Sequence, residues 1–268
     1  MKLLKTLAAF LTALALALSV VGLGIFACTL PPVTQVLASN FARDDLSPFN
    51  KEQLTHVANA TRDFSFGSHD ELALYRTIYG VDKELENSAA QTNTVLSQDF
   101  PKLQVVSDLD AISQYREAFF GASEVYCYSP EAVSHLNDCY QLAAVGYPGL
   151  MVVCALAIAG MATLALPIMR EDESYRRLGN TTLVGGAAVL LGLLGLGTWA
   201  ALDFNGFFTA FHELLFAAQG NWTFPFNSLL ICALPEAFWM GMGAVALGMA
   251  VLLSIVLIVA GIRLRCRQ

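Results

Sequence analysis

Long apolar runs alternate with polar stretches along the chain. The first run, Leu7 to Cys28, holds no charged side chain. At about 1.5 Å of helix per residue, it is long enough to cross a hydrocarbon core of roughly 30 Å. Three later runs of comparable length follow, so the pattern predicts an all-α membrane protein with four transmembrane helices. The expected segments are a first transmembrane helix at 1–28, an extracytoplasmic domain at 29–143, a second transmembrane helix at 144–169, a cytoplasmic loop at 170–180, a third transmembrane helix at 181–202, an extracytoplasmic interfacial loop at 203–228, a fourth transmembrane helix at 229–262 and a cytoplasmic tail at 263–268.

The first run is typical of an uncleaved anchor rather than a signal peptide. Its apolar stretch exceeds the usual h-region of about 7 to 15 residues, and no A-x-A-like site follows it cleanly. Ile25–Cys28 has some likeness to a lipobox, but the bulky Phe26 near the cysteine argues against processing.

The segment between the first two runs predicts a mainly helical domain. Leu54–Thr61 has apolar residues at helical spacing. Ser47–Pro48 predicts the start of that helix and Ser129–Pro130 the start of another, each with serine as N-cap and proline at the first helical position. The second helix should continue directly into the second span. The polar stretch Ser88–Gln98 fits neither helix nor strand clearly.

Composition and charge agree with a membrane protein and orient it. The chain is 56% hydrophobic and 14% charged, with a mean hydropathy of +0.55, which is too apolar for an ordinary soluble domain. Positive charge gathers on one side of the four runs, so we expect both termini in the cytoplasm. The charges in question are Lys2, Lys5, Arg170, Arg176, Arg177, Arg263, Arg265 and Arg267.

The expected extracytoplasmic domain is acidic. It holds sixteen acidic and seven basic residues, so the low isoelectric point of about 5.0 belongs to this part of the chain. A nucleic-acid partner is therefore not expected. The spans contain almost no ionisable residue and show no internal repeat, which disfavours a transporter.

His135 is the first candidate for chemistry. It lies on the helix expected after Ser129, and Asp138 follows at i+3 on the same helical face. A carboxylate in that place can hold one imidazole nitrogen and fix the tautomer. The same spacing also fits a solvated helix with an incidental His and Asp, and the sequence leaves both readings open.

His212 is the second candidate. It lies in an aromatic stretch directly after the third span, flanked by Phe211 and Phe216, where we expect an interfacial helix at the depth of lipid ester carbonyls. The alternative is an amphipathic helix whose histidine only faces headgroups. Asn221–Trp222 then predicts a turn with an interfacial tryptophan. Glu236 lies near the start of the last apolar run, where we expect its carboxylate either to lie at a shallow, solvated depth in the membrane or to be paired with a basic group or a proton.

The sequence lacks other catalytic signatures. It has no G-x-S-x-G, H-E-x-x-H, C-x-x-C or phosphate-loop motif, so we expect no metal ion and no cofactor. Cys127 and Cys139 share the exported segment around His135, and we expect a disulfide between them in an oxidising compartment. The oligomeric state is not predicted.

Five segments of the chain carry a resemblance to a known family: Tyr128–Asp138 (YSPEAVSHLND), Phe211–Phe216 (FHELLF), Asn221–Pro225 (NWTFP), Leu229–Ile231 (LLI) and Pro235–Phe238 (PEAF). In these segments the chain resembles the bacterial lipoprotein intramolecular transacylase (Lit) family, and the resemblance covers nearly the whole chain. Two features depart from the family pattern: Cys139 replaces the usual hydrophobic residue, and Asn227–Ser228 stands where the family tends to carry an acidic residue.

The resemblance implies an enzyme that acts on diacylated lipoproteins in the cell membrane. It would move the sn-2 acyl chain of the diacylglyceryl group onto the α-amine of the lipoprotein's first cysteine, giving a lyso-form lipoprotein. His135 and His212 match the family's two functional histidines, with Asp138 orienting His135, and they should converge at the outer interface. The expected contacts to substrate and membrane lipid are Phe211, Phe216, Asn221, Trp222 and Glu236.

A non-catalytic membrane adaptor is the alternative. Such a protein would bind exported or envelope proteins through its ectodomain and would have the same spans and charges. The two hypotheses differ in whether His135 and His212 face one lipid-accessible cavity. An enzyme of this kind requires such a cavity, whereas an adaptor does not.

Overall fold

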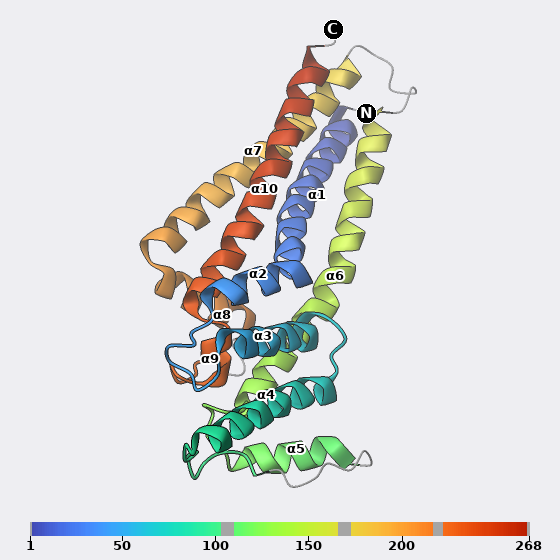
Figure 1. The fold of residues 1–268 in the computed structure, drawn as a ribbon. Helices are drawn as coiled ribbons and strands as arrows, with labels where there is room; N and C mark the ends of the chain where they lie inside the picture. The colour runs from blue at the N-terminus through green and yellow to red at the C-terminus, as the bar shows by residue number, and fades with distance from the viewer. Residues whose placement is uncertain (1, 103–109, 166–172, 217–221, 267–268) are drawn as a thin grey trace. The chain divides into compact units, whose positions relative to one another are not determined.

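The computed structural model describes residues 2–102, 110–165, 173–216 and 222–266 (Figure 1). All regular secondary structure in these residues is helical, as the sequence predicts. The helices are α1 (Lys2–Cys28), α2 (Pro31–Phe41), α3 (Lys51–Phe66), α4 (Glu71–Thr92), α5 (Ala111–Phe120), α6 (Pro130–Ala165), α7 (Glu173–Leu202), α8 (Phe204–Phe216), α9 (Leu229–Ala233) and α10 (Glu236–Arg265).

Four of these helices are long and apolar enough to cross a membrane, which confirms the predicted fold class. They are Leu3–Cys28, Pro130–Ala165, Tyr175–Leu202 and Glu236–Arg265. The fourth apolar run, expected as one helix at 229–262, forms two helices instead: α9 ends at Ala233 and α10 begins at Glu236. Pro235 lies between them and has no backbone N–H to donate, so it interrupts helical hydrogen bonding there.

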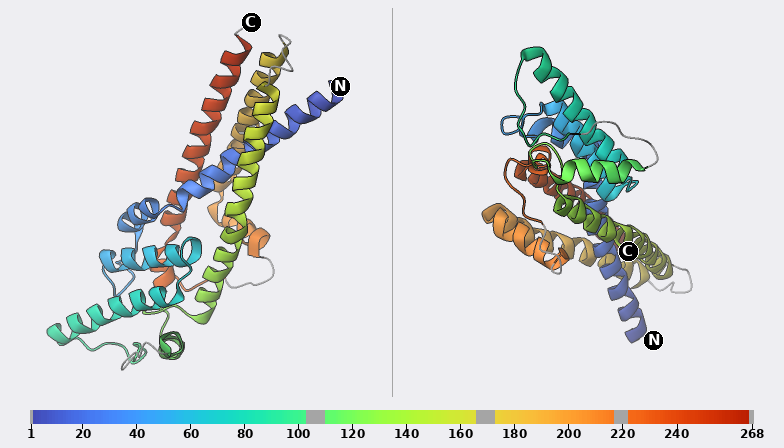
Figure 2. Two further views of the ribbon diagram at one scale, coloured as in Figure 1. Left: turned by 90° about the vertical axis from the view of Figure 1, so that its right-hand side faces the viewer. Right: turned by 90° about the horizontal axis from the view of Figure 1, so that it is seen from below.

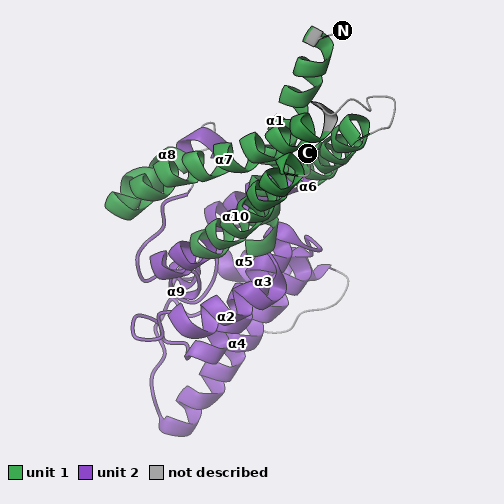
Figure 3. Cartoon of the chain, turned by 90° about the horizontal axis from the view of Figure 1, so that it is seen from above, with its two compact units in different colours: residues 1–28, 145–211, 243–268 green, residues 29–144, 212–242 purple. Residues whose placement is uncertain are grey.

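The chain forms two compact units (Figure 3). Unit 1 comprises residues 1–28, 145–211 and 243–268, and unit 2 comprises residues 29–144 and 212–242. Each unit therefore combines segments that are far apart in the sequence.

Unit 1 is a bundle in which backbones approach closely. A Cβ added to Gly186 of α7 would lie 2.8 Å from the Ser254 carbonyl oxygen, and one added to Gly24 of α1 would lie 2.6 Å from the Ala246 carbonyl oxygen. Only glycine fits at such distances, and small residues at helix contacts are typical of membrane bundles. Beside these contacts, a small apolar cluster forms around Val189.

Unit 2 is built on the α3–α4 pair, whose members lie side by side in Figures 1 and 2. Their shared core includes Leu54, Ile78 and Leu74, each at most 1% exposed. The short helix α9 also packs against α3, and its Leu229 and Cys232 are fully buried.

The start of α3 corrects the sequence prediction. The helix begins at Lys51, and its N-cap is Asn50 rather than Ser47. The Asn50 side chain accepts a hydrogen bond from the Gln53 backbone N–H at 2.9 Å, and the Gln53 side chain accepts one from the Asn50 N–H at 3.0 Å. This reciprocal capping box satisfies two helix-end donors at once. Ser47 instead accepts a bond from Phe49, within the preceding turn.

Helix α4 includes the first five residues, Ser88–Thr92, of the polar stretch that the sequence left unassigned. It runs to Thr92, and Asn93 follows in the left-handed region with φ of 52°. Asp82 on this helix is 2% exposed, and its carboxylate oxygens have no hydrogen-bond partner. Burial, reinforced by the negative charge of Glu86, raises the pKa of the Asp82 carboxyl to about 8.

Candidate active site

Helix α6 positions the first candidate, His135. The helix opens as predicted, with the Ser129 hydroxyl accepting a hydrogen bond from the Ala132 N–H at 3.3 Å and Pro130 in the first turn. It then continues without interruption to Ala165. Just before this helix, the buried Tyr128 hydroxyl lies 2.6 Å from the Thr61 hydroxyl of α3. Burial raises the Tyr128 pKa, so the phenol stays neutral and anchors the start of α6.

Helix α8 positions the second candidate, His212, beside the first. His212 is 7% exposed, and its ring centroid lies 5.8 Å from that of His135. The two residues are 77 positions apart in the sequence and belong to unit 2. The predicted convergence of the two histidines is therefore confirmed.

Aromatic rings enclose this histidine pair. Phe216 contacts both imidazoles, with centroid distances of 5.0 Å to His135 and 5.7 Å to His212. Trp222 lies 4.9 Å from His212, and Phe224 lies 6.0 Å from His135. The pair thus lies in an apolar environment, where hydrogen bonds and charge–charge interactions are stronger than in water.

Cys139 also belongs to the pair's surroundings. Its Sγ lies 3.8 Å from His135 Nε2, one helical turn further along α6. The expected Cys127–Cys139 disulfide is not formed, because both are free cysteines with different neighbours. Cys127 Sγ instead donates to the Phe119 and Ser123 carbonyls, and burial raises its pKa to about 12.

The other predicted site residues lie in varied places. Asp138 is half-buried on α6, beside Cys139. Phe211 contacts Phe207 within unit 1, at a centroid distance of 6.5 Å. Glu236 is exposed at the first position of α10. Asn221 lies outside the described residues.

Sequence reasoning did not assign two neighbours of the pair, Phe224 and Cys139, to the site, although Phe224 belongs to the Asn221–Pro225 motif of the family resemblance. The i+4 spacing of Cys139 from His135 was a usable signal, because residues at that separation share a helical face. No periodicity pointed to Phe224, which lies outside any helix.

The arrangement suits proton transfer to and from one reacting group. General acid–base catalysis needs heavy atoms within about 3 Å of the proton they exchange, or one bridging water. A group lying between two imidazoles whose centroids are 5.8 Å apart can satisfy this for both rings. Among the described residues, no group of three or more His, Cys, Asp or Glu side chains is placed to hold a metal ion.

Solved structures with the same fold exist. The chain is similar to the membrane integral lipoprotein intramolecular transacylase Lit from Bacillus cereus, with 15% identity, 98% of this chain and 97% of that chain covered, and a TM-score of 0.62. A variant of the same protein with one histidine replaced by arginine matches with 16% identity, 97% and 92% coverage and a TM-score of 0.56. No curated protein matches the chain by sequence.

The family comparison is more specific than the fold. The model of the family described as lipoprotein intramolecular transacylase Lit matches residues 7–239, which include both histidines and the aromatic residues around them. The activity in this family's name is an acyltransferase activity. The chain therefore belongs to the lipoprotein intramolecular transacylase (Lit) family.

Proposed function

We propose that this protein moves the sn-2 acyl chain of a diacylglyceryl-cysteine lipoprotein to the α-amine of that cysteine. The product is a lyso-form lipoprotein with an acylated N-terminus. The observation that carries the proposal is the His135–His212 pair, 5.8 Å apart between ring centroids and enclosed by aromatic side chains. Family membership supplies the reaction class, and the pair supplies a base and an acid at one place.

The reaction needs both proton removal and proton delivery. An α-amine with an ordinary pKa of about 7.7 to 8.0 is mostly protonated at neutral pH, whereas an imidazole is mostly neutral. One imidazole takes a proton from the ammonium group, and the free amine attacks the sn-2 ester carbonyl. The new C–N bond forms, and its nitrogen gives up a second proton to an imidazole. The C–O bond breaks, the departing glyceryl oxygen receives a proton from an imidazolium, and the remaining proton passes to water.

We assign the base to His212 and the acid or electrostatic partner to His135. His212 is the more enclosed of the two, with Trp222 and Phe216 against its ring. His135 has Asp138 one turn along α6 as a candidate orienting carboxylate.

Enclosure favours transfer over hydrolysis. Water competes with the amine for the ester, and apolar walls lower its access to the reacting carbonyl. Amine and ester belong to one substrate molecule, so holding them together supplies a large part of the rate enhancement. Phe216 and Trp222 offer apolar surface to the acyl chain, and we assign further substrate contacts to Phe211, Asn221 and Glu236.

We also propose that both termini are cytoplasmic and that the histidine pair works on the extracytoplasmic side. The support is the one-sided distribution of lysine and arginine next to the spans. Single-cysteine labelling with a membrane-impermeant reagent should leave a cysteine at position 176 unlabelled in intact cells and label one at position 83. Labelling at position 176 would contradict this orientation.

The catalytic proposal is tested in a host that lacks N-acylation of lipoproteins. Mass spectrometry of a lipoprotein's N-terminal peptide should detect the acyl-amide, lyso-glyceryl product only when this protein is present. His135→Ala and His212→Ala should each lower product formation by about 100-fold or more, the usual range for general acid–base groups.

His56→Ala is the matched control for these variants. His56 is an exposed histidine on α3 in the same unit, and its variant should match the wild type. Normal product from both His135→Ala and His212→Ala, in correctly inserted protein, would rule out the catalytic role of the pair.

A further inference from the structure

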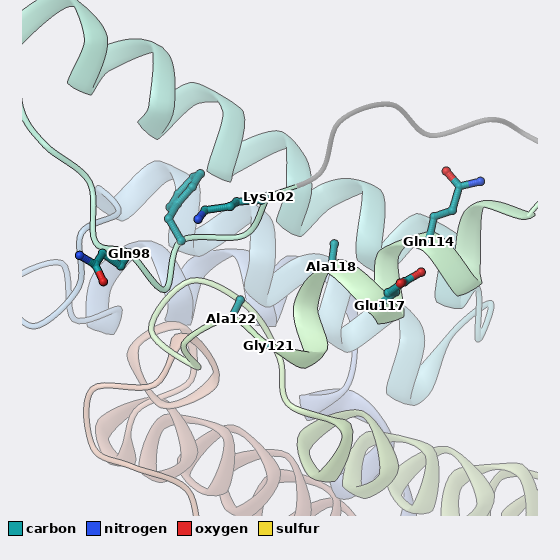
Figure 4. Close-up of a pocket in the computed structure, with 8 residues that line it drawn as sticks. Gln98, Lys102, Gln114, Glu117, Ala118, Gly121 and Ala122 are labelled. Atoms are coloured by element: carbon teal, nitrogen blue, oxygen red, sulfur yellow. The ribbon is translucent and has the colours of Figure 1, made fainter.

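An open groove of about 460 Å³ lies in unit 2, apart from the histidine pair. Gln98 and Lys102, on the segment after α4, form one side, and Glu117 of α5 lies on the other. Figure 4 shows Gln98 and Lys102 on the segment after α4, and Gln114, Glu117 and Ala118 on α5. The volume falls within the range of about 300 to 1,000 Å³ typical of ligand sites. Neither His135 nor His212 lines the groove.

The segment that forms one wall is held in place by backbone bonds and ring contacts. The Ser123 N–H donates to the Asp99 carbonyl at 2.9 Å, and the Phe100 N–H donates to the Ser97 carbonyl at 3.1 Å. The Phe100 ring, which lines the groove, packs edge-on against Tyr126 at 5.1 Å between centroids. A site formed in advance loses less conformational entropy when a ligand binds.

The lining is mixed in charge and rich in hydrogen-bonding capacity. Lys102 and Glu117 are both exposed and of opposite sign, so a ligand of a single charge meets one favourable and one unfavourable group. The Gln98 amide offers both donors and acceptors, as a peptide backbone requires. Ala118 and Gly121 carry little side-chain bulk, which leaves room for a main chain to approach.

We propose that this groove binds the polypeptide of the lipoprotein substrate, downstream of its acylated cysteine, as an extended chain read mainly through its backbone. The proposal rests on the proposed function. A groove lined by amides and by both charge signs accommodates many sequences, because each residue of an extended chain presents the same N–H and C=O groups.

The groove connects to the histidine pair through fixed backbone. Gly121 at the groove leads into the segment whose Glu124 carbonyl accepts a hydrogen bond from the Leu229 N–H at 2.7 Å, and this segment continues into α6 and His135. A substrate held at both sites is bound at two points, so binding in the groove raises the effective concentration of the amine and ester at the pair.

Gly121→Trp tests the proposal by filling the groove. Gly121 has φ of −101°, and a Cβ added there meets nothing within 4 Å, so the larger side chain enters open space without backbone strain. Gly80→Trp is the matched control, because Gly80 of α4 is equally open and does not line the groove.

Two substrates separate binding in the groove from chemistry. With the full-length protein in lipid, Gly121→Trp should raise KM at least tenfold for a diacylated lipoprotein. It should leave KM for a diacylglyceryl-cysteine dipeptide unchanged, since the dipeptide lacks the polypeptide that the groove is proposed to bind. Gly80→Trp should match the wild type on both substrates. Equal KM values for wild type and Gly121→Trp on the lipoprotein would overturn the proposal.

Two further measurements cover the remaining outcomes. If Gly121→Trp also loses activity on the dipeptide, the surface variant Gln98→Ala/Lys102→Ala takes its place in the same comparison. This variant should raise KM for the lipoprotein and leave KM for the dipeptide unchanged, and an unchanged KM for the lipoprotein would overturn the proposal. Fluorescence anisotropy of a labelled, lipid-free peptide from the lipoprotein reports binding without catalysis and should show at least tenfold weaker binding to Gly121→Trp. Equal or absent binding overturns the groove proposal, whereas a wild type that binds this peptide but makes no product overturns only the proposed function.

Discussion

The two units of this protein are stabilised by opposite kinds of packing. In unit 1, helices approach at glycines such as Gly186, and large apolar side chains such as Leu191, 71% exposed, point away from the unit's interior. In unit 2, large side chains such as Leu54 are fully buried and helix ends are capped by polar groups. The difference shows that each unit is matched to its own solvent: apolar lipid provides no hydrophobic drive between helices, whereas water does.

Truncating a core leucine should give the largest effect on stability. Leu54→Ala in unit 2 should lower the free energy of unfolding by about 2 to 5 kcal/mol, because it removes buried apolar surface and leaves a cavity. Leu191→Ala in unit 1 removes the same atoms from an exposed position and should change it by less than about 0.5 kcal/mol. Thermal unfolding of both variants in one lipid mixture compares them, and equal losses would contradict the distinction between the units.

The buried carboxyl of Asp82 should make the stability of unit 2 depend on pH. Its pKa is about 8 in the folded protein, above the ordinary value of 3.8. As the pH rises, Asp82 therefore ionises in the unfolded chain at a lower pH than in the folded protein. Unit 2 should therefore lose stability from pH 4 to pH 8 and change little above that, with a loss on the order of 4 kcal/mol between pH 4 and pH 7.

Asp82→Asn should remove this dependence. The measurement is the hydrogen-exchange rate of amides in α3 and α4, taken at each pH as the ratio of the wild-type rate to the Asp82→Asn rate. This ratio cancels the intrinsic effect of pH on exchange. A ratio that stays constant between pH 5 and pH 8 would contradict a protonated Asp82. Amides of α7 in unit 1 serve as an internal reference.

Enlarging a contact glycine should damage unit 1 more than enlarging an open one. Gly186→Leu puts side-chain atoms where the Ser254 carbonyl lies, and overpacking of this kind costs about 1 to 3 kcal/mol. Gly192→Leu on the same helix meets nothing within 4 Å of its Cβ and should be neutral. Melting temperatures in lipid or detergent report the difference, and equal values would show that close approach at Gly186 does not stabilise the bundle.

Replacing Cys139 should have the smallest effect. A thiol is a weak hydrogen-bond donor, so its contact with His135 Nε2 at 3.8 Å orients the imidazole only weakly. Cys139→Ala should lower the transacylation rate by less than about tenfold, a small loss beside that of His135→Ala. Cys139→Ser, which keeps a donor, should lie between Cys139→Ala and wild type. A loss as large as that of His135→Ala would give Cys139 a direct part in the chemistry.

The sequence predicted the spans and the convergence of the histidines for different reasons. Apolar runs report which solvent surrounds a segment, so four spans could be read directly. The closeness of His135 and His212 followed from the family resemblance, because no periodicity relates residues on two separate helices. The start of α3 was misplaced because Ser47–Pro48 and Asn50–Gln53 are both plausible caps, and reciprocal hydrogen bonding decides between them.

Other features depend on tertiary contacts that no local pattern contains. Cys127 and Cys139 share an exported segment, but Cys127 faces the carbonyls of Phe119 and Ser123 while Cys139 faces His135. The contact of Phe224 with His135 joins a loop to a helix 89 positions earlier in the chain.

The burial of α9 in unit 2 has a consequence for the order in which the protein is made. Most of unit 2 is synthesised by residue 144, but its α9 residues emerge only after α7 and α8. Until then, α3 has α2 and α4 beside it but lacks its contact with α9, and the backbone groups of Arg43 and Glu124 lack the bonds they make with Cys232 and Leu229. Domains generally fold as units during synthesis, so unit 2 must wait for the ribosome to deliver its last segment. The nascent chain therefore cannot assemble its histidine pair until nearly all of it has been translated.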